Sequence, residues 1–321
     1  MKKYGFFLLF AIALSFAACG DDNEGGGGDK PSSENVNRNT GKGASFVMTE
    51  TSDAVNASGK FINRLEVPKL QNGDVFIVHQ STDMTGNPVN YCAAYVSTKQ
   101  HSRWVAYRFD KAMSVITADG GRKPYDERPQ YPQDPYYDVQ PYDDASFAGY
   151  DHGHLCASYD RQCSRKSNDQ TFYMTNMSPM MARFNQDYWP IYESYVQSLA
   201  RDKKNVFADT LYVVKGGTIE SGQTLGNINV AGEKMPQPKY YFIALLSYKS
   251  GGYSGIAFWI EHQEYPSISN KDSEISKHAI SIDELEQKTG IDFFCNLPDK
   301  LENAVEKTLS RTSWRLPEIT N

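Results

Sequence analysis

The stretch that decides the fold is YDHGHLCASYDRQCSRKSNDQTFYMTNMSPMMARFNQDYWPIYESYVQSLA, residues 150–200. It begins with a strand-like segment that carries His154, and a polar loop follows. A second strand is predicted over TFYMTN and ends at Asn176, after which a helix opens near Asn185. Two strands and a helix in this order bring three polar side chains within reach of one point: His154, Asn185 and Glu193.

The predicted helix has a geometry that suits a cation beside a base. Asn185 and Glu193 stand eight residues apart, about 2.2 helical turns, so they can share one helix face. Pro190 lies between them and lacks an N–H, so we expect it in the first turn or at a bend, with Asn185 at the N-terminal edge. One amide oxygen and one carboxylate suit Mg²⁺, which keeps several waters, whereas zinc or copper would need the imidazoles.

This block resembles the DNA/RNA non-specific endonucleases of the ββα-metal fold. Their signature reads approximately D-R-G-H, then T-N-x-x-P, then N-x-x-x-W-x-x-x-E. The resemblance extends more weakly from about Phe76 to roughly Asn296 and so covers most of the folded body. The positions that match the three parts in order are Asp151, Gly153 and His154; Thr175, Asn176 and Pro179; and Asn185, Trp189 and Glu193.

The resemblance implies a role for each polar position. His154 would be the general base that takes a proton from the attacking water. Asn185 would bind Mg²⁺ directly, with Mn²⁺ as a possible substitute, and Glu193 would hold metal-bound water. Asn176 would orient the loop or His154 by hydrogen bonding. The implied activity is hydrolysis of phosphodiester bonds in DNA and RNA to 5′-phosphate products.

Family members also carry an upstream arginine that stabilises the pentacoordinate phosphate. Arg128 is the candidate here, with Arg122 as a rival. Two positions depart from the family pattern: His152 replaces the arginine of D-R-G-H, and Gln197 stands where an arginine often follows the glutamate. Because an imidazole titrates near pH ~6.5, we expect weaker activity or a preference for lower pH.

The rest of the chain predicts one α+β domain, residues 45–321, around a large and mostly antiparallel central sheet. Helices are expected over about 185–203, over 281–289, where Ser281 precedes Glu284 at capping-box spacing, and from Pro298 onward. The strands are expected in DVFIVHQ from Asp74, PVNYCAAYVS from Pro88, RWVAYRFD from Arg103, TFYMTN from Thr171, TLYVVKG from Thr210, KYYFIALLSYK from Lys239 and SGIAFWIEH from Ser254.

The N-terminus has the features of an export signal. Two lysines precede an apolar run that is shorter than a membrane span needs, about 20 residues. The sequence around Cys19 resembles the lipobox of bacterial lipoproteins, which predicts a signal over 1–18 and a lipid anchor at Cys19 in the cell envelope, with an outer-membrane location favoured. The alternative is an ordinary secretory signal cut near Ala18. Residues 19–44 predict a flexible linker.

Four cysteines remain if Cys19 carries lipid, and an even number in an oxidising compartment favours disulfides over buried free thiols. Sequence cannot separate the three possible connectivities, and no spacing resembles a CxxC zinc clip. The four residues are Cys92, Cys156, Cys163 and Cys295.

The net charge of −6 falls to −8 once the signal with Lys2 and Lys3 is removed, which argues mildly against a polyanionic partner. A basic cluster of Arg161, Arg165 and Lys166 could offset this at a phosphate backbone. DNA and RNA are therefore the predicted partners. Two alternatives stay open: a phosphodiesterase on small or single-stranded substrates, and a surface lipoprotein that binds nucleic acid with little or no catalysis.

Overall fold

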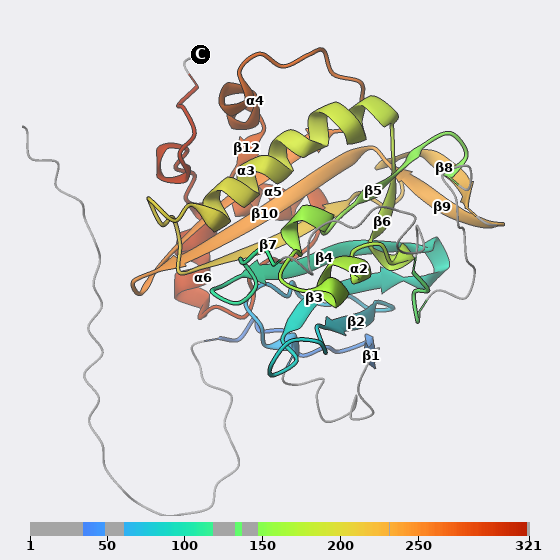
Figure 1. The fold of residues 1–321 in the computed structure, drawn as a ribbon, viewed down its shortest axis with the longest axis horizontal. Helices are drawn as coiled ribbons and strands as arrows, with labels where there is room; N and C mark the ends of the chain where they lie inside the picture. Colours follow the sequence, from blue (N-terminus) through green and yellow to red (C-terminus); the bar gives the residue numbers. More distant parts are fainter. Residues whose placement is uncertain (1–34, 49–60, 118–131, 137–146, 231, 320–321) are drawn as a thin grey trace, which may run out of the picture. The chain divides into compact units, whose positions relative to one another are not determined.

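The computed structural model describes residues 35–48, 61–117, 132–136, 147–230 and 232–319. Its centre is an eight-stranded sheet in the order β1-β2-β3-β4-β7-β10-β11-β12 (Figure 1). Only the β1–β2 pair is parallel among these described strands, so the predicted α+β class with a mostly antiparallel sheet is confirmed. The strands are β1 (Ser45–Met48), β2 (Val75–Gln80), β3 (Val89–Val96), β4 (His101–Phe109), β7 (Thr210–Gly217), β10 (Tyr240–Lys249), β11 (Gly252–Glu261) and β12 (Ala279–Ile280).

Both faces of the sheet are buried, because its central strands are apolar on both sides. Along β10, Tyr241, Ile243 and Leu245 enter one core cluster, while the alternate residues Phe242 and Ala244 enter the other. Side chains that alternate along a strand point to opposite faces of the sheet, so each cluster is one layer of packing. The site described below lies on the first of these faces.

The first face is covered by a short ribbon, β5 (Asp151–His154) with β6 (Met177–Met180), and by the helices α2 (Arg165–Gln170), α3 (Trp189–Arg201) and α4 (Lys271–Lys277). Figure 1 shows α3 lying along the sheet beside β7 and β10. Residues 61–70, α5 (Ile282–Thr289) and α6 (Asp299–Lys307) cover the second face. A hairpin, β8 (Thr224–Val230) with β9 (Glu233–Pro238), forms a separate two-stranded sheet. Its residues Ile228, Val230 and Met235 belong to the first core cluster.

The helix ends follow the capping signals in the sequence. The Ser281 hydroxyl accepts the N–H of Glu284 at 3.1 Å, and α5 ends at Gly290, which has a φ of 68° that suits glycine. Pro190 falls in the first turn of α3, as predicted, and Pro298 caps α6. The helices α2 and α4 and the β8–β9 hairpin were not predicted from the sequence.

The strand predicted over TFYMTN is wrong. Thr171 ends α2, where its hydroxyl donates to the Asn168 carbonyl at 2.7 Å, and residues 174–176 form the 3-10 turn η5 (Met174–Asn176). The strand β6 starts only at Met177. Side-chain bonds to the local backbone favour turns over an extended conformation, which explains the shift.

The chain docks on the body before the predicted start at Ser45. Asn39 is buried and donates to the Pro68 carbonyl at 2.9 Å, while Asn35 donates to the Leu297 carbonyl at 2.7 Å. The predicted linker boundary at residue 44 therefore lies too far along the chain. The predicted signal, Cys19 and the first part of the linker fall outside the described residues. Within those residues, no helix is both long and apolar enough to cross a membrane.

The disulfide prediction is also wrong, because Cys92, Cys156, Cys163 and Cys295 are all buried free thiols. Cys92 and Cys156 belong to core clusters on opposite faces of the sheet, so the sheet separates them. The Cys163 sulfur instead meets the Met113 sulfur at 3.9 Å. Burial raises the pKa of Cys92 and of Cys156 to about 12, which makes both thiols chemically inert at neutral pH.

A buried histidine gives the fold a testable pH dependence. His79 is fully buried between the rings of Tyr91 and Tyr173, at 4.5 and 5.1 Å, and burial lowers its pKa to about 3. In the unfolded chain this imidazole takes up a proton below pH ~6.5, whereas in the folded chain it stays neutral. Protonation therefore favours the unfolded chain, and the free energy of unfolding falls as the pH drops below that value.

We expect the free energy of unfolding to fall more in the wild type than in His79→Phe between pH 7 and pH 5. The difference should be roughly 2 kcal/mol, because the phenyl ring can keep the contacts with the Tyr91 and Tyr173 rings and cannot titrate. Urea unfolding at the two pH values measures it. Equal losses in both proteins would show that His79 is protonated in the native state at pH 5.

Candidate active site

The β5–β6 ribbon presents the histidine at its end. Its register pairs Asp151 with Met180 and His154 with Met177. Gly153 stands between the two histidines because a Cβ there would collide with the Met180 side chain across the ribbon. This close approach explains the glycine of the D-x-G-H block in physical terms.

Two contacts hold His154, one through its ring and one through its backbone. The imidazole packs edge-to-face with the Phe172 ring at 4.8 Å, and the backbone carbonyl accepts the indole N–H of Trp189 at 3.2 Å. The His152 ring lies 6.0 Å from it on the same ribbon. Trp189 begins α3, so the histidine strand and the helix are tied together at this point.

Asn176 is fully buried and clamps the segment that follows His154. Its amide group donates to the carbonyls of Cys156 and Thr171, at 2.9 and 2.6 Å, and its side-chain oxygen accepts the Cys156 N–H at 2.8 Å. Its backbone carbonyl accepts the Leu155 N–H at 3.0 Å. Because it has no exposed surface, Asn176 acts as a positioning residue and does not meet a substrate.

Asn185 lies in a π-helical turn, η6 (Phe184–Tyr188), directly before α3. Its amide N–H donates to the Asp151 carboxylate at 3.0 Å, and Gln186 donates to the same oxygen at 2.8 Å. Asp151 thereby fixes the orientation of the Asn185 amide. The Asn185 oxygen accepts no hydrogen bond from the described residues. Such π turns recur at functional sites.

Glu193 is partly buried and lies about one turn into α3. Burial raises its pKa to about 7; Lys215 opposes this shift and Asp160 adds to it. A carboxyl group in this environment gains from a nearby cation, because a cation favours the charged form. The structure thus places a histidine, an oriented amide oxygen and a carboxyl group on the ribbon and helix of one ββα unit, where the sequence predicted them.

A buried network lies beneath this unit and has no signal in the local sequence pattern. Lys215 and Asp160 are both fully buried, with Nζ and Oδ2 3.4 Å apart. Asp160 also accepts bonds from Tyr107 at 2.5 Å and Gln197 at 2.9 Å. Burial alone would raise the pKa of Asp160, but Lys215 and these bonds outweigh it and hold the pKa below its usual range. Gln197, noted as a departure from the family, is thus an anchor of α3.

Burial removes Arg161 from the predicted basic cluster, while Arg165 and Lys166 are partly exposed. Arg161 is fully buried and donates to the carbonyls of Asn90 and Arg108, each at 3.0 Å. The Arg165 guanidinium pairs with the Asp169 carboxylate at 2.8 Å, so a phosphate would have to compete with that carboxylate. The predicted phosphate arginine Arg128 and its rival Arg122 lie outside the described residues.

A short antiparallel ribbon that carries a histidine, followed by a helical turn that carries an asparagine, is the arrangement expected of a ββα-metal nuclease site. The profile of the DNA/RNA non-specific endonuclease family matches residues 71–300. The chain belongs to this family, and the family's enzymes are hydrolases. Its members are typically metal-dependent.

Individual relatives are distant. A nuclease of Nostoc sp. is 26% identical over 220 residues, which are 67% of this chain and 75% of that protein. The mitochondrial endonuclease G of Caenorhabditis elegans is 32% identical over 176 residues, so the match spans about half of each chain, 51% and 54%. A crystal structure of the EndoG/EndoGI complex aligns with a TM-score of 0.50 at 18% identity, over 66% of this chain and 85% of that one, and supports the fold.

We expect Asp160→Asn to lower the free energy of unfolding by about 3–5 kcal/mol, because it leaves the Lys215 ammonium buried without a counter-charge. Urea unfolding measures the loss. Adding Lys215→Met to the same chain should recover much of it, while Asp187→Asn, in an exposed pair with Arg183, should change it by less than about 1 kcal/mol. A loss no larger than that of Asp187→Asn would rule out a stabilising role for the pair.

Proposed function

We propose that this protein is a Mg²⁺-dependent endonuclease that cleaves DNA and RNA with little sequence preference and leaves 5′-phosphates. One observation carries the proposal: the ribbon holds His154 beside α3, where Asp151 orients the Asn185 amide. Membership of the family supports the reaction class. Phosphate-directed chemistry needs no base-reading motif, since backbone contacts position a substrate without specifying its sequence.

The residues present fit a hard cation. Asn185 offers an amide oxygen whose N–H side is already bound to Asp151, so the oxygen can face an ion without rotating. Glu193 would hold water bound to that ion, and its raised pKa would fall once the ion is near. Few protein ligands and several retained waters are the preference of Mg²⁺. The imidazoles are not needed as ligands, which leaves His154 available for proton transfer.

In the proposed reaction His154 accepts a proton from water as the water oxygen attacks phosphorus. The bond from phosphorus to the 3′ oxygen breaks, so the phosphate stays on the 5′ side and the 3′ oxygen leaves as a hydroxyl after taking up a proton. When bound, Mg²⁺ neutralises the charge that builds on the phosphate and the leaving oxygen. Asn176 fixes the chain after His154, and Arg128 would stabilise the phosphate.

We further propose that the enzyme is held in the cell envelope by lipid at Cys19, with the outer membrane favoured. The sequence before Cys19 supports this by its short apolar run and small residues. The segment between Cys19 and the first described residues is rich in glycine and acids and would act as a tether. A single acyl chain anchors weakly, so stable attachment needs the two or three chains that a lipoprotein carries.

The first test is digestion of supercoiled plasmid and of a structured RNA by the purified full chain, with Mg²⁺ or with EDTA. We expect both to be cut with Mg²⁺ and neither with EDTA. His154→Ala should lower the rate by about 10²–10⁴-fold, because a positioned general base contributes this much. A variant purified in parallel that cuts as well as the parent would place the activity elsewhere or in a contaminant.

Asp151 provides a separate test of the metal ligand. We expect Asp151→Asn to raise the Mg²⁺ concentration needed for half-maximal cleavage by about 10–100-fold, because a neutral amide is a weaker acceptor for the Asn185 N–H than the carboxylate. Excess Mg²⁺ should restore much of the rate in Asp151→Asn but not in Asn185→Ala, which lacks the ligand itself. Identical Mg²⁺ titrations for wild type and Asp151→Asn would contradict the orienting role.

A further inference from the structure

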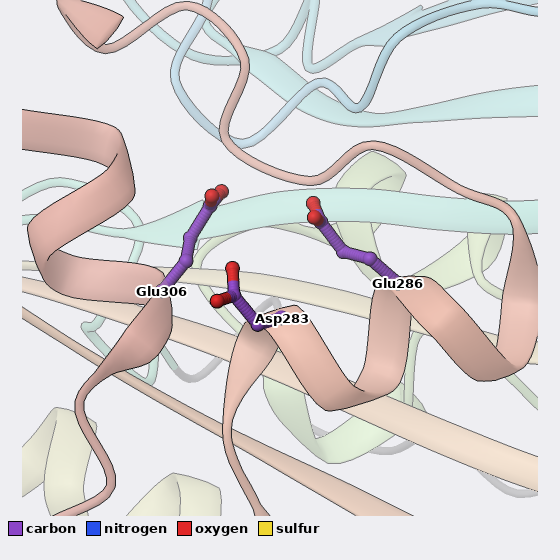
Figure 2. Close-up of side chains that lie close together, drawn as sticks. All are labelled: Asp283, Glu286 and Glu306. Atoms are coloured by element: carbon purple, nitrogen blue, oxygen red, sulfur yellow. The ribbon is translucent and has the colours of Figure 1, made fainter. Parts of the chain in front are cut away.

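A second group of carboxylates lies on the sheet face opposite the active site, between α5 and α6. Asp283 and Glu286 are one turn apart on α5, and Glu306 stands in the last turn of α6. One oxygen from each side chain lies within 4.8 Å of the others. Figure 2 shows the three carboxylates gathered around one point from the two helices.

We call Asp283, Glu286 and Glu306 the acidic cluster. Glu306 gives the strongest evidence that the cluster binds a ligand. Its exposed fraction is 5%, and its Oε1 atom is buried with no hydrogen-bond partner in the described part of the chain. Glu286, by contrast, accepts the backbone N–H of Phe293 at 2.7 Å. A buried carboxylate without a donor is costly, so an oxygen aimed into a cluster of other carboxylates indicates that a positive group belongs there.

No basic side chain of the described residues supplies that charge. The nearby Lys69 donates to Asn37 at 2.6 Å and pairs with Asp292 at 3.4 Å, outside the cluster. Burial, together with neighbouring carboxylates, raises the pKa of Glu286 to about 8 and that of Glu306 to about 9. The cluster must therefore bind protons or a cation at neutral pH.

We propose that the acidic cluster is a binding site for Ca²⁺ that fastens α6 to α5. Its donors are all carboxylate oxygens, which excludes the softer metals that need nitrogen or sulfur. Ca²⁺ takes six to eight oxygens in flexible geometry, and carboxylates from two helices can meet that more easily than the strict octahedron of Mg²⁺. Asp283 and Glu286 are partly exposed, so water can fill the remaining positions.

The site is distinct from the nuclease centre in position and in ligand type. The two helices pack on the β10–β11 side of the sheet through Ile282, Leu285 and Val305, residues of the second core cluster. An ion between them would stabilise that layer without touching His154 or Asn185. Its expected effect is thus on stability, and it does not depend on whether the proposed nuclease reaction is correct.

The test measures thermal unfolding and calorimetric binding of CaCl₂ with the full chain carrying Asn185→Ala, so that the proposed catalytic ion does not interfere. With Ca²⁺ at about a hundredfold above its Kd, we expect the Tm to rise by about 5 °C or more. Adding Glu306→Gln should abolish this rise. The matched control is Glu284→Gln, which removes the same charge from an exposed position on α5 and should keep the full rise.

Asp283→Asn, at a partly exposed position, provides a second variant if Glu306→Gln fails to fold, and it should weaken Ca²⁺ binding at least tenfold. MgCl₂ at the same concentration should give a clearly smaller rise in Tm; an equal one would overturn the assignment to calcium. Absence of binding up to about 10 mM, roughly tenfold above the weak end for calcium modules, would overturn the site and leave shared protons as the stabilising ligand. A Ca²⁺-dependent rise in Tm that is unchanged in Glu306→Gln would also overturn the site.

Discussion

The buried ion pair between Lys215 and Asp160 joins the central sheet to the layer that carries the active site. Lys215 stands on β7 between Val105 and Ile243, in the middle of an apolar face. Two charges removed from water are tolerated only if they are paired and hydrogen-bonded, and Tyr107 and Gln197 complete the set. Since Gln197 belongs to α3, the pair also fixes the helix on the sheet.

The proposed catalytic groups are held in place by neighbouring side chains. Asn176 binds the backbone on the C-terminal side of His154, and Trp189 binds the carbonyl of His154 itself. Asp151 accepts a hydrogen bond from the Asn185 amide and so fixes its orientation. A site built on a short ribbon and one helix turn would otherwise be loose, and small displacements of a catalytic group cost much of the rate. This dense support fits the proposed nuclease reaction, in which positioning and charge stabilisation do most of the catalysis.

The two faces of the sheet therefore have different chemistry. The site face combines aromatic packing with buried polar networks, whereas the opposite face packs apolar side chains around the buried Arg64–Glu66 pair and carries the acidic cluster between α5 and α6. The cluster brings negative charge into a layer that otherwise depends on hydrophobic burial. A cation there would hold α5 and α6 together by charge, as the Lys215–Asp160 pair holds the layers on the other side.

The sequence by itself determined the features that depend on local patterns. Runs rich in β-branched and aromatic residues predicted most strands of the central sheet, the Ser281 and Pro298 signals placed two helices, and the D-x-G-H and N-x-x-x-W-x-x-x-E blocks predicted the ββα unit with His154, Asn185 and Glu193. Tertiary structure decided what depends on meetings between distant residues. It left the cysteines as free thiols, because the sheet and core packing keep them apart, and it buried Arg161. It also brought Asp160 to Lys215 and Glu306 to Asp283, since only the folded chain determines which charges share one water-free space.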